Sequence, residues 1–319
     1  MKQLIIYMMN TSILMLIIII MMMISVAFST LFERKILSYM HYRKGPNKVS
    51  MWGLLQPFSD AMKLLSKEFF FPKNSNYNFY LISPMMMLIL IMMLWLIYPF
   101  KMNMYNWSLS TLYMLCLMSM GVYGLMIAGW SSNSCFSMLG GMRSIAQSIS
   151  YEVIFSIIFL INLLMINSLS LIKLFMFQKY SWLLILMWPT SMILLMSMLA
   201  ELNRTPFDLS EGESELVSGF NIEYSSHGFV LIFLSEYSSI IFMMFIFNLM
   251  YMCSDLFSLF FFFTLMILIF FIFWTRITLP RIRYDLLMYF CWIYLLPISL
   301  TLFMYFMMFK SLMEISFFM

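Results

Sequence analysis

Long apolar runs are the feature that most limits the fold of this chain. Each of eight runs is about as long as the roughly 20 residues that a helix needs to cross the hydrocarbon core of a bilayer. The runs cover residues 4–28, 81–100, 109–129, 145–166, 183–200, 228–251, 256–275 and 286–309. The pattern predicts an all-α, polytopic membrane bundle of about eight transmembrane helices, with residues 1–319 forming a single integral membrane domain.

The composition excludes most other kinds of protein. Hydrophobic residues make up 63% of the chain and charged residues 10%, against about 25% charged in an average soluble domain. A soluble enzyme, a nucleic-acid-binding module and a disordered protein are therefore excluded. The chain has 40 Met and 34 Phe but only 10 Gly and 9 Pro. Since Gly and Pro have GC-rich codons, this bias indicates an AT-rich organelle genome.

Motifs for redox centres and nucleotides are missing from the sequence. The four cysteines are far apart and form no CxxC pair, and the two histidines, His41 and His227, lie outside the apolar runs. No glycine-rich phosphate loop occurs. We therefore expect no redox centre, metal site or nucleotide in this chain alone. The first run lacks a cleavage site and is followed by Glu33, Arg34 and Lys35, which predicts a retained helix and not a signal peptide.

The basic residues predict how the chain is oriented. The connections after the first, third, fifth and seventh runs hold 13 of the 18 Lys and Arg residues. By the positive-inside rule, these connections lie on the inner side of the membrane and both termini lie outside.

The first inner connection, residues 29–80, contains a helical pattern over residues 52–68. Leu55, Phe58, Met62 and Leu65 recur at steps of three or four, and Pro57 suits a first turn. This pattern predicts an amphipathic helix that lies on the membrane surface or against a partner. A solvated surface helix is the alternative.

The acidic connection, residues 201–227, departs from the positive-inside pattern. It holds six of the 14 acidic residues. Crowded carboxylates repel one another unless some bind protons or meet basic partners. An ordinary solvated acidic loop would explain most of them, but Glu201 and, nearby, Glu236 adjoin or enter apolar runs.

Three acids are expected at membrane depth, namely Glu152, Glu201 and Glu236. A charge there is costly, so such residues usually face a bundle interior or water. A single one could be a protonated packing residue. Three together, with Glu33 at the end of the first run, favour a proton or ion relay.

The whole chain resembles the subunit 1 family of respiratory NADH:ubiquinone oxidoreductase, complex I. The resemblance is carried by Glu33-Arg34-Lys35, by Arg43-Lys44-Gly45-Pro46-Asn47, and by residues 53–63, 143–153, 201–224 and 281–285. It implies a core membrane subunit that forms the access channel for ubiquinone and links quinone reduction to proton translocation.

The resemblance also implies partners, cofactors and a location. Ubiquinone is the substrate, while FMN and iron–sulfur clusters are held by partner subunits and none by this chain. The partners are the peripheral quinone-site and iron–sulfur subunits, neighbouring membrane-arm subunits and membrane lipids, with no nucleic acid. The implied location is the mitochondrial inner membrane, with both termini on the intermembrane-space side.

The same resemblance assigns roles to particular residues. Those implied for the quinone channel are Arg34, Arg43, Asp60, Phe233 and Arg281. Those implied for the proton relay are Glu33, Glu152, Glu201, Asp208, Glu211, Glu213, Glu215 and Glu236. No residue is expected to be catalytic in electron transfer.

Three other functions are compatible with parts of the sequence. A stand-alone proton-coupled transporter or channel would explain the buried acids, but it predicts internal repeats, and none is convincing. The equivalent subunit of a membrane-bound hydrogenase-type complex would share the motifs without needing a quinone. A purely structural anchor would have no use for buried carboxylates.

Overall fold

The structure is a computed structural model that describes residues 2–99, 107–179, 181–210, 212, 216, 219–253, 255–256 and 258–318. Helices are the only regular elements in these residues, which confirms the all-α membrane bundle. Within the described part of the chain, seven helical segments are long and apolar enough to span a membrane. They are α1 (Lys2–Met40), α3 (Tyr77–Trp95), α4 (Ser110–Ser131), α5 (Cys135–Ile166), α10 (Ser226–Tyr251), α11 (Leu259–Thr278) and the continuous segment from α12 (Tyr284–Tyr289) through a π-helical turn (Phe290–Leu295) into α13 (Leu296–Phe318).

The fifth apolar run is not one helix, which corrects the expectation of eight uninterrupted spans. It is divided into α7 (Leu183–Leu186) and α8 (Trp188–Glu201). Met187 between them has a non-helical backbone, and Pro189 occupies the first turn of α8. Because proline has no backbone N–H, it is tolerated at a helix start but interrupts a helix interior. A further short helix, α6 (Leu171–Phe177), follows α5.

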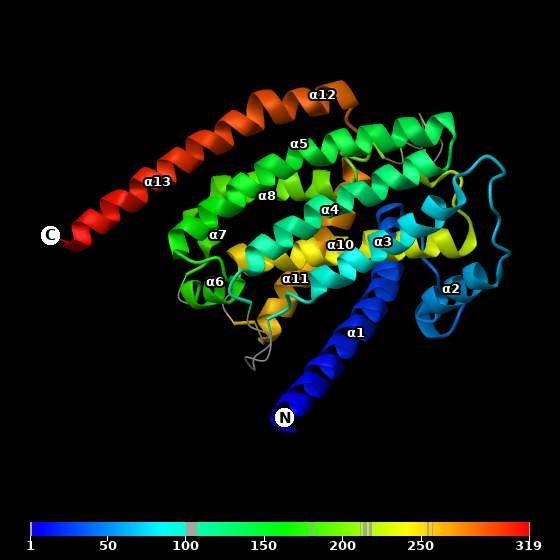
Figure 1. Cartoon of the computed structure of the whole chain (residues 1–319), viewed down its shortest axis with the longest axis horizontal. Helices are drawn as coiled ribbons and strands as arrows, with labels where there is room; N and C mark the ends of the chain where they lie inside the picture. Colours follow the sequence, from blue (N-terminus) through cyan, green and yellow to red (C-terminus); the bar gives the residue numbers. More distant parts are fainter. Residues whose placement is uncertain are drawn as a thin grey trace.

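Helix α10 is the centre of the bundle. It packs against α3, α11 and α1, and its side chains from Ile240 to Tyr251 are nearly all buried. The axes of α3, α4, α5 and α8 lie roughly parallel to that of α10 (Figure 1), and of these four helices α3 and α8 pack against it. Helices α4 and α5 approach closely at two glycines, since a Cβ on Gly129 would lie 3.2 Å from the Cα of Gly141. Small residues permit such close contacts between membrane helices.

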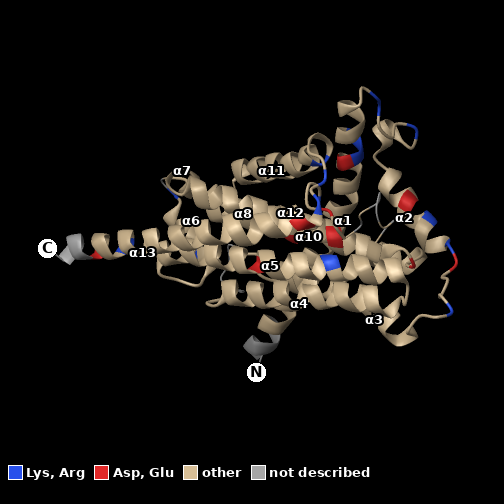
Figure 2. Cartoon of the chain, turned by 90° about the horizontal axis from the view of Figure 1, so that it is seen from above, with Lys and Arg blue, Asp and Glu red and all other residues tan. Residues whose placement is uncertain are grey.

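Charged residues gather at one end of the bundle, around the inner end of α1 and around α2 (Gln56–Ser66), and are sparser toward the opposite end (Figure 2). Helix α2 is the predicted amphipathic helix of the first inner connection, shortened to 11 residues and with Pro57 in its first turn. The apolar side chains of Phe58, Met62 and Leu65 on this helix are exposed.

Candidate site of buried carboxylates

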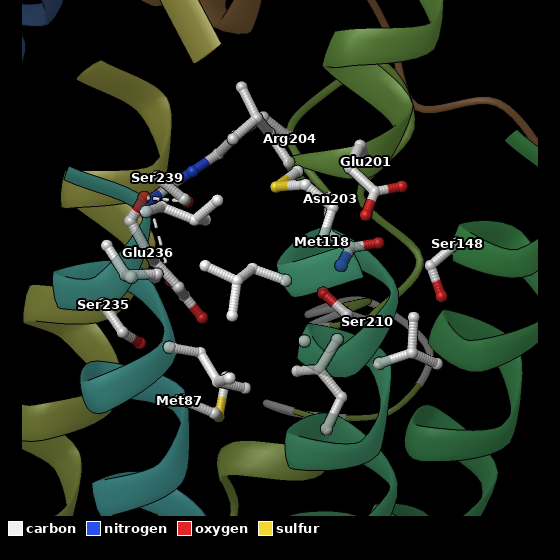
Figure 3. A pocket seen from close by; sticks show the side chains of 18 of the residues that line it. Met87, Met118, Ser148, Glu201, Asn203, Arg204, Ser210, Ser235, Glu236 and Ser239 are labelled. Atoms are coloured by element: carbon white, nitrogen blue, oxygen red, sulfur yellow. Dashed lines mark hydrogen bonds and ion pairs between the residues drawn. The ribbon is translucent and has the colours of Figure 1, made fainter. Parts of the chain in front are cut away.

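A cavity of about 120 Å³ lies among α3, α4, α8 and α10. Two of the acids expected at membrane depth line it on opposite walls, Glu201 at the end of α8 and Glu236 on α10 (Figure 3). Apolar side chains such as Met87 on α3 and Met118 on α4 fill much of the wall between them. The folding of distant segments therefore brings these two carboxylates to one enclosed space.

Arg204 provides the positive charge of this cavity. It lies in the turn that follows α8, and its side chain crosses the cavity toward α10 (Figure 3). Its Nη2 lies 3.6 Å from Oε2 of Glu236, and both side chains are largely buried. The guanidinium carbon also lies 4.8 Å from the ring centroid of Tyr237. One cation therefore contacts two successive residues of α10, through an ion pair and a cation–π contact.

Tyr237 connects the cavity to a second buried acid, Glu33 of α1. The Tyr237 hydroxyl donates a hydrogen bond to Oε2 of Glu33, and Nη1 of Arg276 on α11 donates to Oε1. The Glu33 side chain is only 3% exposed. A buried carboxylate is stable in such a place when its oxygens are paired and hydrogen-bonded. Three helices thus meet at one charged group.

Glu201 has a different environment from Glu33. Its Oε2 is buried and has no hydrogen-bond partner. The neighbouring wall of the cavity belongs to α5, the helix that also carries Glu152. Ser148, one turn before Glu152, lines the same cavity. A charged carboxylate without a partner is costly in such a place, so this part of the cavity is suited to a group that exchanges a proton.

The turn between α8 and residue 210 is fixed by contacts on both sides. The Gln147 side-chain nitrogen donates to the backbone carbonyls of Ala200 and Phe207, each at 2.8 Å. Nη2 of Arg281 lies 2.9 Å from Oδ2 of Asp208. Asp208 and Arg281, assigned to different roles from sequence, are therefore an ion pair that holds this turn against the segment before α12.

The far end of the acidic connection is anchored by two tyrosines. The rings of Tyr80 and Tyr224 stack with centroids 4.3 Å apart. The Tyr80 hydroxyl donates to the backbone carbonyl of Glu223 at 2.5 Å, and the hydroxyls of Tyr224 and Ser83 lie 2.7 Å apart. Burial raises the pKa of the Tyr224 hydroxyl above its ordinary value, so it remains neutral at physiological pH.

Arg34 and Asp60 form a separate pair nearer the surface. Nη1 of Arg34 on α1 lies 2.6 Å from Oδ2 of Asp60 on α2, and Gln56 donates to the other oxygen of Asp60 at 2.9 Å. This contact ties α2 to the inner end of α1. Arg43 is exposed in the segment after α1. Phe233 contacts Tyr237 along α10, with ring centroids 4.7 Å apart and the ring planes tilted by 43°.

The structure thus groups the sequence-predicted residues unevenly. Glu201 and Glu236 line the cavity, Glu33 is joined to it through Tyr237 and Arg204, and Glu152 lies on α5 one turn after the lining residue Ser148. Arg34 and Asp60 form their own pair, and Arg43 stands apart. Glu211, Glu213 and Glu215 lie outside the described residues. In the part of the chain that the structure describes, no group of His, Cys, Asp and Glu could hold a metal ion.

Sequence reasoning missed two residues of this site, Tyr237 and Arg276, which complete the Glu33 cluster. Tyr237 directly follows a membrane carboxylate and Arg276 ends an apolar run, and both positions are signals that a buried polar partner was needed. Which carboxylate each would meet could not be read from spacing, because the contacts are more than 200 residues apart in sequence for Glu33.

Comparison with known proteins gives the family. A family model described as NADH dehydrogenase matches residues 13–307. NADH-ubiquinone oxidoreductase chain 1 of Aedes aegypti is 52% identical over 283 residues, covering 89% of this chain and 90% of that protein. The protein of the same name from Locusta migratoria is also 52% identical with the same coverage. The one from Apis mellifera ligustica is 48% identical and covers 88% of this chain and 92% of its own length.

These matches span nearly the whole bundle, including every helix that contributes to the cavity. The chain therefore belongs to the NADH dehydrogenase family, among relatives named NADH-ubiquinone oxidoreductase chain 1.

Proposed function

We propose that this chain is a core membrane subunit of a proton-pumping NADH:ubiquinone oxidoreductase. In this role it forms the access channel for ubiquinone and links quinone reduction to proton translocation through its acidic residues. The observation that carries the proposal is the connected series of polar and charged groups from Glu33 through Tyr237 and Arg204 to Glu236 and the cavity that Glu201 lines. The family membership supplies the reaction to which this series belongs.

The channel is proposed to begin between α1 and α2. The Arg34–Asp60 pair joins these helices, and the exposed apolar face of α2 provides a surface that suits a quinone tail. Partner subunits would supply the FMN, the iron–sulfur clusters and the electrons, while this chain positions the quinone.

The coupling follows from electrostatics. Reduction of a quinone to a quinol takes up two electrons and two protons, so negative charge develops transiently near the channel. Glu33 is the buried acid next to the helix pair that forms the proposed channel. A change in its charge alters the field on Tyr237 and Arg204, and hence the strength of the Arg204–Glu236 pair. Proton exchange at Glu236, Glu201 and Glu152 would then follow the redox step.

The proposed location is the mitochondrial inner membrane, with both termini on the intermembrane-space side. The excess of Lys and Arg in the connections at one end of the bundle supports this orientation (Figure 2). The codon bias toward Met and Phe supports an organelle-encoded chain.

The proton relay is tested by replacing Glu201 with Gln in the assembled complex. Glu201→Gln keeps the size of the side chain and removes its ability to gain and lose charge. We expect NADH:quinone turnover to become slower and the number of protons pumped per electron to fall. Asp285→Asn is the matched control, because Asp285 is an exposed acid that pairs with Arg283 at the surface. An unchanged proton-to-electron ratio in Glu201→Gln would contradict the relay.

The channel is tested separately with a photoreactive ubiquinone analogue. Labelling is expected on the inner end of α1 and on α2, and it should be reduced by an excess of ubiquinone. Labelling that avoids both helices would contradict the channel while leaving the relay untouched.

A stand-alone proton-coupled transporter is the second candidate, favoured by the enclosed acidic cavity. Purification in mild detergent separates the two functions. The proposed subunit should migrate with a large assembly that contains flavin and iron–sulfur clusters, whereas a transporter should migrate alone.

A further inference from the structure

A second hollow lies at the opposite end of the bundle from the acidic cavity. It has a volume of about 610 Å³ and forms where the start of α4, the end of α5 and α6 meet. Along α5, the distance from Glu152 to Asn167 at this hollow is about 22 Å at the helical rise of 1.5 Å per residue. The two sites are therefore on different sides of the membrane-spanning region (Figure 1).

The lining of the hollow is divided into an apolar and a polar part. Leu160, Leu163 and Leu164 of α5 form an apolar wall. Ser108, Asn167, Ser168, Ser170 and Lys173 supply the polar part of the lining. A site with both parts is matched to an amphipathic ligand, with an apolar body and a polar head.

The polar part is positively charged. Lys173 lines the hollow, and none of the described residues that line it is Asp or Glu. A second ammonium group stands at the rim, since Lys310 of α13 donates a hydrogen bond to the side-chain oxygen of Asn167. The acid nearest to it is Glu314, one turn further along α13 and 4.0 Å from the Lys310 nitrogen. The charge of the hollow therefore favours an anion.

Two of the serine hydroxyl groups in the lining have no hydrogen-bond partner. The side-chain oxygens of Ser168 and Ser170 are buried and have no hydrogen-bond partner, and Ser170 is more than nine-tenths buried. Buried hydroxyl groups are normally hydrogen-bonded, so two neighbouring exceptions indicate that an acceptor from outside the chain belongs here.

We propose that this hollow binds the phosphate of an anionic phospholipid, with an acyl chain along the leucine wall of α5. The phosphate would accept hydrogen bonds from the Lys173 ammonium and the neighbouring serine hydroxyls. A lipid fits better than a free anion, because a free phosphate would leave the leucine wall exposed.

The test uses the assembled complex in detergent and a phosphatidylglycerol that carries a photoreactive group on one acyl chain. We expect labelling of the α5 segment that contains Leu160, Leu163 and Leu164. Lys173→Gln should weaken the labelling about fivefold at subsaturating lipid, as removal of one basic residue near a lipid surface does. Lys179→Gln is the matched control, because Lys179 is exposed nearby and does not line the hollow.

Two competition arms distinguish the source of the phosphate. Unlabelled phosphatidylglycerol should displace the probe, whereas phosphatidylcholine and millimolar inorganic phosphate should not. Displacement by inorganic phosphate, equal labelling in Lys173→Gln and Lys179→Gln, or cross-linking of Lys173 to an acidic segment of another subunit would each overturn the proposal. Native gel electrophoresis of each variant establishes that the complex has assembled.

Discussion

Replacement of Tyr237 with Phe should loosen the contact between α1 and α10. Phe keeps the aromatic ring, which lies 4.8 Å from the Arg204 guanidinium carbon and 4.7 Å from the ring of Phe233. The substitution therefore removes only the hydroxyl that donates to Glu33. A hydrogen bond to a charged group contributes about 1.5–3 kcal/mol, which corresponds to roughly 10- to 100-fold in an equilibrium.

Hydrogen exchange followed by mass spectrometry measures this effect where it arises. In the assembled complex, amides in peptides from residues 29–40 of α1 and 226–240 of α10 should exchange roughly 10- to 100-fold faster in Tyr237→Phe, since local opening becomes easier by that factor. Tyr123→Phe is the matched control, because Tyr123 is an exposed tyrosine on α4. Peptides far from Glu33, such as those of α13, should be unchanged in both variants.

A second variant shows which of the two contacts with Glu33 contributes more to stability. Arg276→Gln leaves a buried carboxylate without its cation, and loss of one partner of a buried pair costs about 3 kcal/mol or more. Its effect on the same peptides should exceed that of Tyr237→Phe. The weakest hydrogen bond to a charged group already predicts a roughly tenfold increase in the exchange rate. Exchange rates within about threefold of the wild type in both variants would therefore refute the reasoning that Glu33 joins these helices.

Three further predictions concern the ends of the acidic connection. Gly140→Ala should lower the yield of assembled complex on native gels, because the new Cβ would lie 3.0 Å from the Cα of Gly219. Gly121→Ala is the control and should leave the yield unchanged, because nothing lies within 4 Å of its Cβ. Equal yields of the two variants would contradict this prediction. Asp208→Asn and Arg281→Gln should each make the amides of residues 204–210 exchange faster. Their effects on the free energy of local opening should deviate from additivity by about 0.5–3 kcal/mol in a double-mutant cycle, and additive effects would contradict the ion pair. Tyr80→Phe should increase exchange at residues 219–224 about fivefold, through loss of one hydrogen bond of about 1 kcal/mol to the Glu223 carbonyl, and no increase would mean that the stacked rings alone hold this segment.

The spans could be predicted largely because the bilayer imposes one length and one polarity on them. The ends of the helices could not. Helix α5 begins at Cys135, ten residues before the apolar run, because Gly140 and Gly141 pack against Gly219 and Gly129 despite the polar residues around them. Helix α1 likewise continues through Glu33 to Met40. In both places tertiary contacts extend a helix beyond the stretch that hydropathy marks.

The site was predictable in kind but not in its pairing. A carboxylate within an apolar run is conspicuous in sequence, so Glu152, Glu201 and Glu236 could be found. Their partners are ordinary residues until the chain folds. Arg204 could have belonged to any of the six acids of its connection, and Tyr237 could have been one more aromatic residue of α10. Contacts between distant segments, such as Glu33 with Arg276, depend on helix packing that no local pattern encodes.

The length of α1 has a consequence for how this protein responds to its lipid environment. The apolar part of this helix, residues 4–28, is about 37 Å long at the helical rise of 1.5 Å per residue, which exceeds a hydrocarbon core of about 30 Å. Hydrophobic mismatch of this kind is relieved by inclining the helix or by thickening the bilayer around it. The inner end of the inclined helix bears Glu33 and Arg34, which bind α10, α11 and α2. A change in the thickness of the surrounding membrane would therefore change the tilt of α1 and so shift the positions of Glu33 and Arg34.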